Sequence, residues 1–246
     1  MWLDALYVKV GEGGRTVGKA VLIATAVTDR GEREAIRVTV AAGEMTVCWA
    51  SFLKELIKRG LRGVELVISD AHTGLQEAIR TELTGTTWQR CVVHFLRNVL
   101  ALVPKSAQAL TAAAFRMAWM QVTYESAREH FGKAIEAIER KFPDAARCAR
   151  AAEEDVLAYM HFPPAHWRQI RSTNPLERLN KEIRRRTDVV GIFPNDAALL
   201  RLVSRLLVEQ NDEWTVGRRY FSMESMSLLE TRRVRLTAET PAIAAK

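Results

Sequence analysis

The hydrophobic pattern of this chain changes period along its length, and this change limits the possible folds more than any other feature. Before residue 42, apolar residues alternate with polar ones or fill both faces, as they do in strands. Glycine-rich or charged turns separate these segments, so an antiparallel meander is predicted. The three predicted strands are 2–10, 18–28 and 36–40.

After this meander, helical and strand patterns alternate. A helix with its apolar residues at helical spacing is followed by the stop signal Gly60, then by a short apolar strand that ends at Asp70. The order β-β-β-α-β-α-β predicts an α/β fold, a mixed five-stranded sheet flanked by helices. The predicted segments are helix 46–59, strand 64–68, helix 73–83 and strand 86–93.

The remainder of the chain is predicted to be helical. Residues 95–166 are rich in Ala and Arg and have no strand pattern, which predicts an all-α insertion. Two further helices are predicted at 173–186 and 197–211. The expected organisation is a core with its first part in 1–100, an α-helical insertion in 101–168, the final core helices in 169–225 and a flexible tail in 226–246.

The charge balance favours a polyanionic partner. The chain has 36 Lys and Arg residues against 29 Asp and Glu, a formal net charge of +7. Nucleic acid suits such a balance, although a merely soluble basic surface fits it equally well. Three cysteines are too few for a disulfide framework, and no apolar run reaches the roughly 18–20 residues of a membrane span. A cytoplasmic chain with no membrane partner is therefore expected.

Three acidic residues occupy positions that suggest a specific role, either in a site or in capping a helix. Asp4 lies among apolar residues of the first strand, Asp70 ends a buried strand, and Glu177 follows Asn174-Pro175 in the first turn of a helix. Each also has an ordinary interpretation. Asp4 fits an edge residue near a terminus, Asp70 a helix N-cap, and Glu177 a capping box with Asn174.

Together the three acids fit metal-dependent phosphodiester chemistry. Two Mg²⁺ ions roughly 3.5–4 Å apart activate the attacking oxygen and stabilise the leaving oxygen in such reactions. Mg²⁺ prefers oxygen ligands and keeps several waters, so a few carboxylates are enough. Asn180, Lys181 and Arg184 share a helix face with Glu177, which suits a metal beside a phosphate backbone.

Four strings in this order give these residues a context. Together they resemble the Mutator-type insertion-sequence transposases of bacteria, over roughly residues 2–225. Any one string is weak, but four in order are specific. They are LDALYVKV at 3–10, VISDAHTGL at 67–75, WQRCVVHFLRN at 88–98 and RSTNPLERLNKEIRRRT at 171–187.

The resemblance implies an RNase H-like fold with an α-helical insertion before the last catalytic helix. It implies that Asp4, Asp70 and Glu177 are the catalytic acids and hold two Mg²⁺ or Mn²⁺ ions. The implied reaction is hydrolysis at transposon ends, followed by attack of the freed 3′-OH on target DNA. The implied partners are double-stranded DNA, both transposon ends and target, and further copies of the chain in a homo-oligomer. The implied location is the bacterial cytoplasm, at the nucleoid.

Cys91 and His94 match the Cys-x-x-His signature of this family. With His161 and His166 they also form a plausible tetrahedral zinc set. Two other interpretations remain open. His94 could lie near the carboxylates and orient a phosphate or water, or Cys91 could simply pack as a small hydrophobe with His94 bonded to backbone.

Basic and aromatic residues around the last string are candidates for DNA contact. Trp167 between arginines could stack on a flipped base or pack the insertion against the sheet. The basic run of the 173–186 helix fits phosphate contact or a solvated face. The predicted DNA-binding residues are Arg90, Trp167, Arg171, Asn180, Lys181, Arg184, Arg185 and Arg186.

The sequence departs from the family in one respect. Members usually carry a sizeable N-terminal region before the first aspartate, whereas Asp4 follows only three residues here. A truncated copy or a fragment is therefore expected. Two alternatives to an active transposase follow: an inactive relic that only binds DNA or full-length transposase, and a nuclease of the same fold that cuts without joining.

Overall fold

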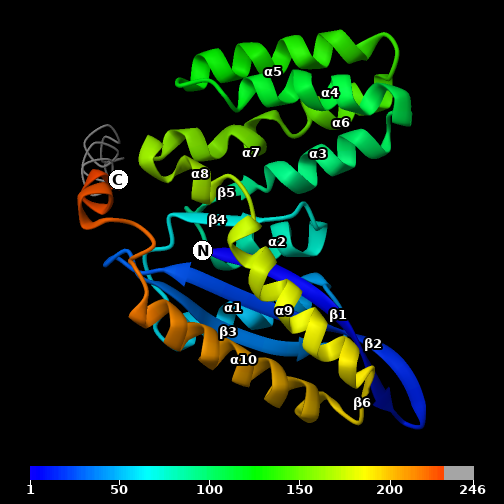
Figure 1. The fold of residues 1–246 in the computed structure, drawn as a ribbon, viewed down its shortest axis with the longest axis vertical. Helices are drawn as coiled ribbons and strands as arrows, with labels where there is room; N and C mark the ends of the chain where they lie inside the picture. Colours follow the sequence, from blue (N-terminus) through cyan, green and yellow to red (C-terminus); the bar gives the residue numbers. More distant parts are fainter. Residues whose placement is uncertain (230–246) are drawn as a thin grey trace, which may run out of the picture.

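The computed structural model describes residues 1–229, and its core is one mixed sheet with strands in the order β3-β2-β1-β4-β5 (Figure 1). A short sixth strand pairs with β1. The strands are β1 (Trp2–Glu12), β2 (Arg15–Val27), β3 (Arg33–Ala41), β4 (Leu66–Ser69), β5 (Thr87–Arg90) and β6 (Ile192–Phe193). The helices are α1 (Thr46–Lys58), α2 (Thr73–Glu82), α3 (Val92–Ala101), α4 (Lys105–Ala118), α5 (Tyr124–Glu139), α6 (Pro143–Arg150), α7 (Glu153–Leu157), α8 (Trp167–Ile170), α9 (Asn174–Val190) and α10 (Asp196–Val216), with 3₁₀ turns η1 (Ala158–His161) and η2 (Pro164–His166).

The first three strands form the predicted antiparallel meander. β1 and β2 pair along their whole length, with Glu12 opposite Arg15 across a two-residue turn. Gly13 and Gly14 have φ angles of 58° and 76°, as a type I′ hairpin turn requires. β2 then pairs antiparallel with β3.

The second half of the sheet is parallel. β4 pairs parallel with β1, with Trp2 opposite Ile68, and β5 pairs parallel with β4. Parallel neighbours need crossover connections, and α1 and α2 lie in these connections. The structure therefore confirms a mixed α/β sheet with RNase H-like topology.

Helices cover both faces of the sheet (Figure 1). Side chains alternate between the faces along β1, so Leu3 packs into the apolar cluster with α1 and α2. Trp2 and Leu6 belong to the other cluster, with Leu179 and Ile183 of α9. Both faces are thus buried, which explains why the central strands are so apolar.

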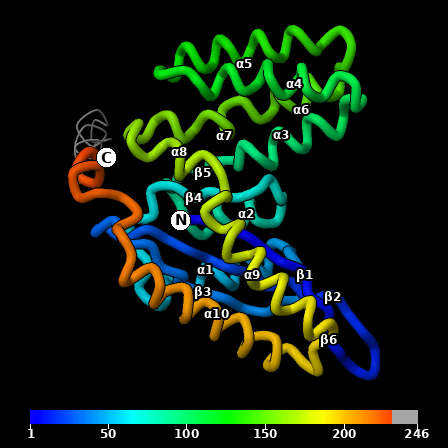
Figure 2. The backbone as a smooth tube through the Cα atoms, in the orientation of Figure 1, coloured from blue at the N-terminus to red at the C-terminus, as the bar shows by residue number. Residues whose placement is uncertain are grey.

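Helices α3 to α8 stack at one end of the sheet (Figure 2), between β5 and α9 as predicted. Their core contains Phe95, Phe115 and Phe131, whose rings pack within 5.1–5.6 Å of each other. The buried Gln89 of β5 joins this segment to the sheet, because its side chain donates to Val156 O and accepts from Tyr159 N. The division of the chain into domains at 100 and 168 stays a prediction. Among residues 1–229, no helix is long and apolar enough to cross a membrane.

Three details differ from the sequence predictions. The fifth strand ends at Arg90, and Val92 already begins α3, so the predicted strand 86–93 was too long. β6 was not predicted, since a two-residue strand carries no alternating pattern. Of the predicted flexible tail, residues 226–229 continue a helix that begins at 223, and Met226 and Leu229 pack on the core. Residues 230–246 lie outside the described part of the chain.

Gly74 allows the loop before α1 to approach the first turn of α2. A Cβ atom at this position would lie 2.7 Å from the carbonyl oxygen of Glu44 and 2.8 Å from the backbone nitrogen of Thr46. These atoms belong to backbone and cannot rotate away. The loop that carries Glu44 therefore depends on the absence of a side chain at residue 74.

We expect Gly74→Ala to lower the free energy of unfolding by about 1–3 kcal/mol, as overpacking does. The measurement is urea denaturation followed by circular dichroism. Gly132→Ala is the matched control, because Gly132 lies within α5 and a Cβ there meets nothing within 4 Å. The control should gain about 0.5–1 kcal/mol from helix propensity. Equal effects of the two substitutions would contradict the close approach at Gly74.

Candidate metal and nucleic-acid site

The pairing of β1 with β4 places Asp4 beside Asp70. Trp2 lies opposite Ile68, and each aspartate follows two residues later, so both carboxylates project to the same side of the sheet. That side is the one covered by α9. β4 ends at Ser69, which places Asp70 at its carboxyl end, where the chain leaves the sheet. The two acids come together because parallel register and side-chain alternation act together.

Asp4 is partly buried and held by two hydrogen bonds. Its carboxylate accepts from the backbone N–H of Ala5 at 2.9 Å and from Nδ2 of Asn180 on α9. Burial raises the pKa of Asp4 above its ordinary value, and the negative charge of Asp70 adds to the rise. The ionised form of Asp4 thus lacks compensation in the protein alone.

Asp70 does not cap the following helix. The N-cap of α2 is His72, and no side chain bonds to the free N–H groups there. Asp70 instead accepts a long hydrogen bond, 3.3 Å, from the backbone N–H of His72. The helix-cap interpretation of Asp70 is therefore wrong, and its carboxylate keeps free lone pairs beside Asp4.

The capping-box interpretation of Glu177 is also wrong. α9 begins at Asn174 itself, with Thr173 as the N-cap and no side-chain cap bond. Glu177 is exposed and has no hydrogen-bond or ion-pair partner among residues 1–229. It lies three residues before Asn180, a spacing that puts Cβ atoms on neighbouring turns about 5–6 Å apart. Glu177 thus lies one helical turn before the residue that bonds to Asp4, but the structure of residues 1–229 does not bring its carboxylate together with the two aspartates as ligands of one ion.

The start of α9 is fastened to the sheet and to α3 by buried contacts. The indole N–H of Trp2 donates to Ser172 O at 3.1 Å, and the N–H of Val92 donates to Arg171 O at 3.0 Å. The Cys91 sulfur accepts from the N–H of Thr173 at 3.3 Å and from its hydroxyl at 3.4 Å. These contacts fix where α9, and with it Glu177 and Asn180, leaves the helical segment.

His94 bonds to Cys91 and faces the two aspartates. Burial opposes ionisation of Cys91, but hydrogen bonds from His94 and Thr173 hold the pKa of its thiol below the ordinary value. The bond to Cys91 raises the pKa of His94, and the charges of Asp4 and Asp70 raise it further. His94 Nδ1 is buried without a partner among the described residues. This placement favours the interpretation in which His94 lies near the carboxylates.

The other two histidines of the proposed zinc set lie elsewhere. His161 stacks on Tyr124 with ring centroids 4.4 Å apart, and His166 bonds to Ser225 and stacks on Phe221. The structure does not bring them to Cys91 and His94, so these residues form no zinc site. Within residues 1–229, no three Asp, Glu, His or Cys side chains are arranged as ligands of one ion.

Even so, the side chains around Asp4 and Asp70 are suited to a divalent cation, because without one their charges repel and an oxygen atom lacks a partner among residues 1–229. Two like charges face one another, and Asn180, which is only 7% exposed, has a buried Oδ1 without a partner in the described chain. A cation would relieve the repulsion and accept these oxygen donors. We therefore take Asp4, Asp70 and Glu177 as the residues that could hold metal.

Sequence patterns gave no sign of a further acid, Glu44, in the loop before α1. It is half-buried, and burial raises its pKa; positive charge on His72 opposes the rise, while Asp70 and Asp4 add to it. Glu44 stands three residues after the third strand, in a turn position where an acid is ordinary. Its nearness to the aspartates depends on the packing of this loop against Gly74.

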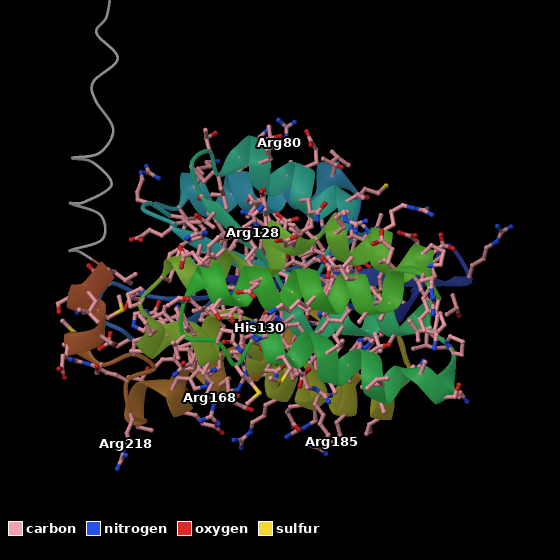
Figure 3. The ribbon with its side chains drawn as sticks, turned by 90° about the horizontal axis from the view of Figure 1, so that it is seen from above. Arg80, Arg128, His130, Arg168, Arg185 and Arg218 are labelled. Carbon is pink, nitrogen blue, oxygen red and sulfur yellow. The ribbon has the colours of Figure 1, made fainter. Side chains whose placement is uncertain are left out.

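Some basic residues of α9 form ion pairs within the protein and others do not. Arg185 and Arg186 both bond to Glu182, which lowers the pKa of that carboxyl to about 2. Lys181 and Arg184 are exposed and have no ion-pair partner in the described chain. In Figure 3, Arg185 points to the same side of the molecule as Arg168 and Arg218, and away from Arg80. One side of the protein is therefore open to phosphate contact.

Three further predicted DNA contacts also interact with other residues of the protein. The indole N–H of Trp167 donates to Phe162 O, and its ring packs edge-on against Tyr159, which supports packing over base stacking. Burial raises the pKa of Tyr159 to about 12, and a hydrogen bond with Arg171 opposes the rise. The guanidinium of Arg90, the last residue of β5, lies 5.6 Å from the ring centre of Phe95 of α3.

Comparison with known proteins agrees with this arrangement. The profile of the family described as "Transposase, Mutator family" matches residues 1–217. The chain belongs to the Mutator family of transposases.

Several curated relatives of this family are similar over most of the chain. The transposase for insertion sequence element IS1081 of Mycobacterium tuberculosis is 44% identical over 240 residues, which is 97% of this chain and 57% of that protein. The transposase for IS406 of Burkholderia multivorans is 41% identical over 90% of this chain and 58% of its own length. The transposase for IS256 in transposon Tn4001 of Staphylococcus aureus is 38% identical, over 89% and 56%. The chain thus spans a little over half the length of these relatives.

We expect Asp4→Asn to raise the melting temperature of this Mutator-family chain at neutral pH when EDTA removes metal. Because the folded pKa is raised, ionised Asp4 costs stability above that pKa, and the cost vanishes below the ordinary value of 3.8. The substituted amide can keep a bond to Asn180, whose own amide flips to present its free Oδ1. The gain should therefore shrink as the pH falls toward 4.

The measurement is thermal unfolding by circular dichroism across this pH range. Asp212→Asn on the exposed side of α10 removes the same charge and should leave the melting temperature unchanged. An Asp4→Asn protein that melts lower than the parent chain at neutral pH would show that the carboxylate is compensated without metal.

Proposed function

We propose that this chain is the catalytic portion of a metal-dependent DNA transposase that cleaves and joins DNA at transposon ends. The observation that carries the proposal is the pair Asp4 and Asp70, side by side at the end of β4, with Asn180 of α9 bonded to one of them. A buried carboxylate with a raised pKa, beside a second carboxylate in a chain of the transposase family, is an arrangement that favours a divalent cation.

Asp4, Asp70 and Glu177 would hold Mg²⁺ or Mn²⁺, and two such ions supply activation of the attacking oxygen and stabilisation of the leaving oxygen. Asn180 keeps the Asp4 carboxylate oriented, and His94 is placed to orient a phosphate oxygen or water. Glu177 is unbonded in the protein alone, so it is free to turn toward the aspartates. Lys181 and Arg184, on the same side of α9, would hold the DNA backbone.

The proposed chemistry has two balanced steps. Water attacks a phosphorus atom at the transposon end, a new P–O bond forms, and the bond to the 3′-oxygen breaks to leave a 3′-OH. This 3′-oxygen then attacks a target phosphorus atom, and the target's own 3′-oxygen leaves with a proton. Each step gains and loses one P–O bond, so the joining needs no external energy source.

The proposed partners follow from this reaction. Transposon ends and target are double-stranded DNA, and pairing of two ends calls for at least two copies of the protein, hence a homo-oligomer. The proposed place of action is the DNA of the bacterial cell. This chain covers 57% of the length of the IS1081 transposase. We therefore propose the complete activity for a protein of that full length.

We expect Mn²⁺ binding, measured by calorimetric titration, to weaken sharply in both Asp70→Asn and Glu177→Gln. Both acids would contribute to one site although they are far apart in the sequence, so each substitution removes a ligand. Glu136→Gln on the outer face of α5 is the matched control and should bind like the parent chain. Strand transfer on labelled DNA ends should fail in the same two variants.

Equal and feeble Mn²⁺ binding in the parent chain and all variants would refute the proposal and favour a relic that only binds DNA or another transposase. Cleaved products without covalent target products would instead indicate a nuclease that cuts but does not join.

A further inference from the structure

A groove of about 1270 Å³ runs between α3, the end of α4 and the segment that leads into α9. It exceeds the ~300–1,000 Å³ of sites for small molecules, so its size suits a segment of a polymer. One end reaches Asn174 and Pro175 at the start of α9, the helix that carries Glu177 and Asn180. The groove therefore leads toward the carboxylates.

The lining of the groove is strongly and uniformly basic. It includes six arginines and no Asp or Glu. Within residues 1–229 none of the six forms an ion pair, whereas five arginines of α5, α6 and α9 do, namely Arg128, Arg147, Arg150, Arg185 and Arg186. The six are Arg33, Arg97, Arg116, Arg168, Arg171 and Arg178.

This positive charge is not compensated by the protein. Arg97, Arg116, Arg168 and Arg178 are exposed, and in Figure 3 Arg168 projects from the same side as Arg185. Like charges in one groove repel and favour an anionic occupant. A chain of phosphates matches the arginines spread along it.

The floor between these arginines is apolar and partly aromatic. Leu96 and Val93 of α3 lie there with Trp119 and the largely exposed Met120, beyond the end of α4. The floor thus offers an apolar and partly aromatic surface on which bases could stack.

We propose that this groove binds a single-stranded segment of DNA, with phosphates on the arginines and unpaired bases on the apolar floor. Basic grooves with stacking surfaces are the usual means of holding single strands. A duplex would leave the floor unused, because its bases are stacked inside and its phosphates face outward. The inference rests on the proposed function, and it adds a separate site for the strand that leads to or from the carboxylates.

Arg33 connects this groove to the catalytic helix. Its guanidinium lies 3.8 Å from the Trp214 ring and 4.7 Å from the Tyr220 ring, and it donates to Pro175 O. Burial lowers the pKa of Arg33, interaction with Tyr220 opposes this fall, and the charge of Arg178 adds to it. Because Arg33 is bonded to Pro175 O, a phosphate bound to Arg33 would lie next to the first turn of α9.

The test is fluorescence anisotropy with a labelled oligothymidine of about 15 nucleotides and a duplex of the same length, without divalent metal. We expect the double variant Arg97→Gln with Arg116→Gln to bind the single strand roughly tenfold more weakly. The slope of log affinity against log salt should fall by about 0.7 for each phosphate that the variant no longer neutralises. Duplex binding should change far less.

The matched control is Arg140→Gln with Arg201→Gln, two exposed arginines outside the groove that remove the same charge. A control that weakens single-strand binding equally would overturn the proposal, as would an equal loss of duplex binding. A change of oligomeric state in size-exclusion chromatography, with single-strand binding intact, would show that a second copy occupies the groove and would also overturn it.

The variant Met120→Ser tests the contribution of base contact to single-strand binding without changing the charge of the groove. Met120 is 72% exposed, so the variant should fold. We expect weaker single-strand binding with an unchanged salt slope, and unchanged binding would contradict base contact with the floor. Asp70→Asn should retain full single-strand binding while it loses strand transfer, so failure of the catalytic proposal and failure of the groove proposal give different results.

Discussion

The aspartate in the central strand is the constraint on which this structure depends. Strand β1 lies between β2 and β4, so a carboxylate on it must sit within the sheet rather than at its edge. Burial without a partner is costly, and here Asp70 adds like charge. Two hydrogen bonds to Asp4, from the backbone N–H of Ala5 and the amide of Asn180, offset only part of this cost. The remaining cost of burying the Asp4 charge is the reason that we propose this place as a cation site.

The position of α9 follows from the same strand. Trp2, two residues before Asp4, bonds to Ser172, and Cys91 at the end of β5 bonds to Thr173. The two ends of the helical segment between β5 and α9 therefore lie next to each other at the sheet. Its own core sets the direction in which α9 crosses β1, and that direction brings Asn180 to Asp4. A change within the helical segment can therefore act on the site without touching it.

The sequence revealed those parts of the fold and site that depend on local pattern. Strand and helix order follows from hydrophobic period, and Asp4 and Asp70 stand out because a charged residue interrupts or ends an apolar strand. Local pattern gave a wrong cap at Asn174 and Glu177, because the N-cap of α9 is Thr173, whose backbone N–H is bonded to Cys91 from a distant part of the chain. Glu44 and the arginine groove come from segments distant in sequence, and only tertiary packing joins them. The zinc set failed for the same reason, because spacing along the chain says nothing about where His161 and His166 pack.

Two uncompensated charge groups of opposite sign lie on either side of the start of α9. The acids Asp4 and Asp70 do not pair with the arginines of the groove, although pairing would relieve both. The segment from Arg171 to Pro175 separates them, and its backbone is bonded to β1 and α3 on one side and to Arg33 on the other. A protein selected only for stability would neutralise such charges internally. Their separation leaves both groups without a counter-charge in the described part of the protein, which supports the proposal that the acids bind cations while the arginines bind phosphates of the same strand.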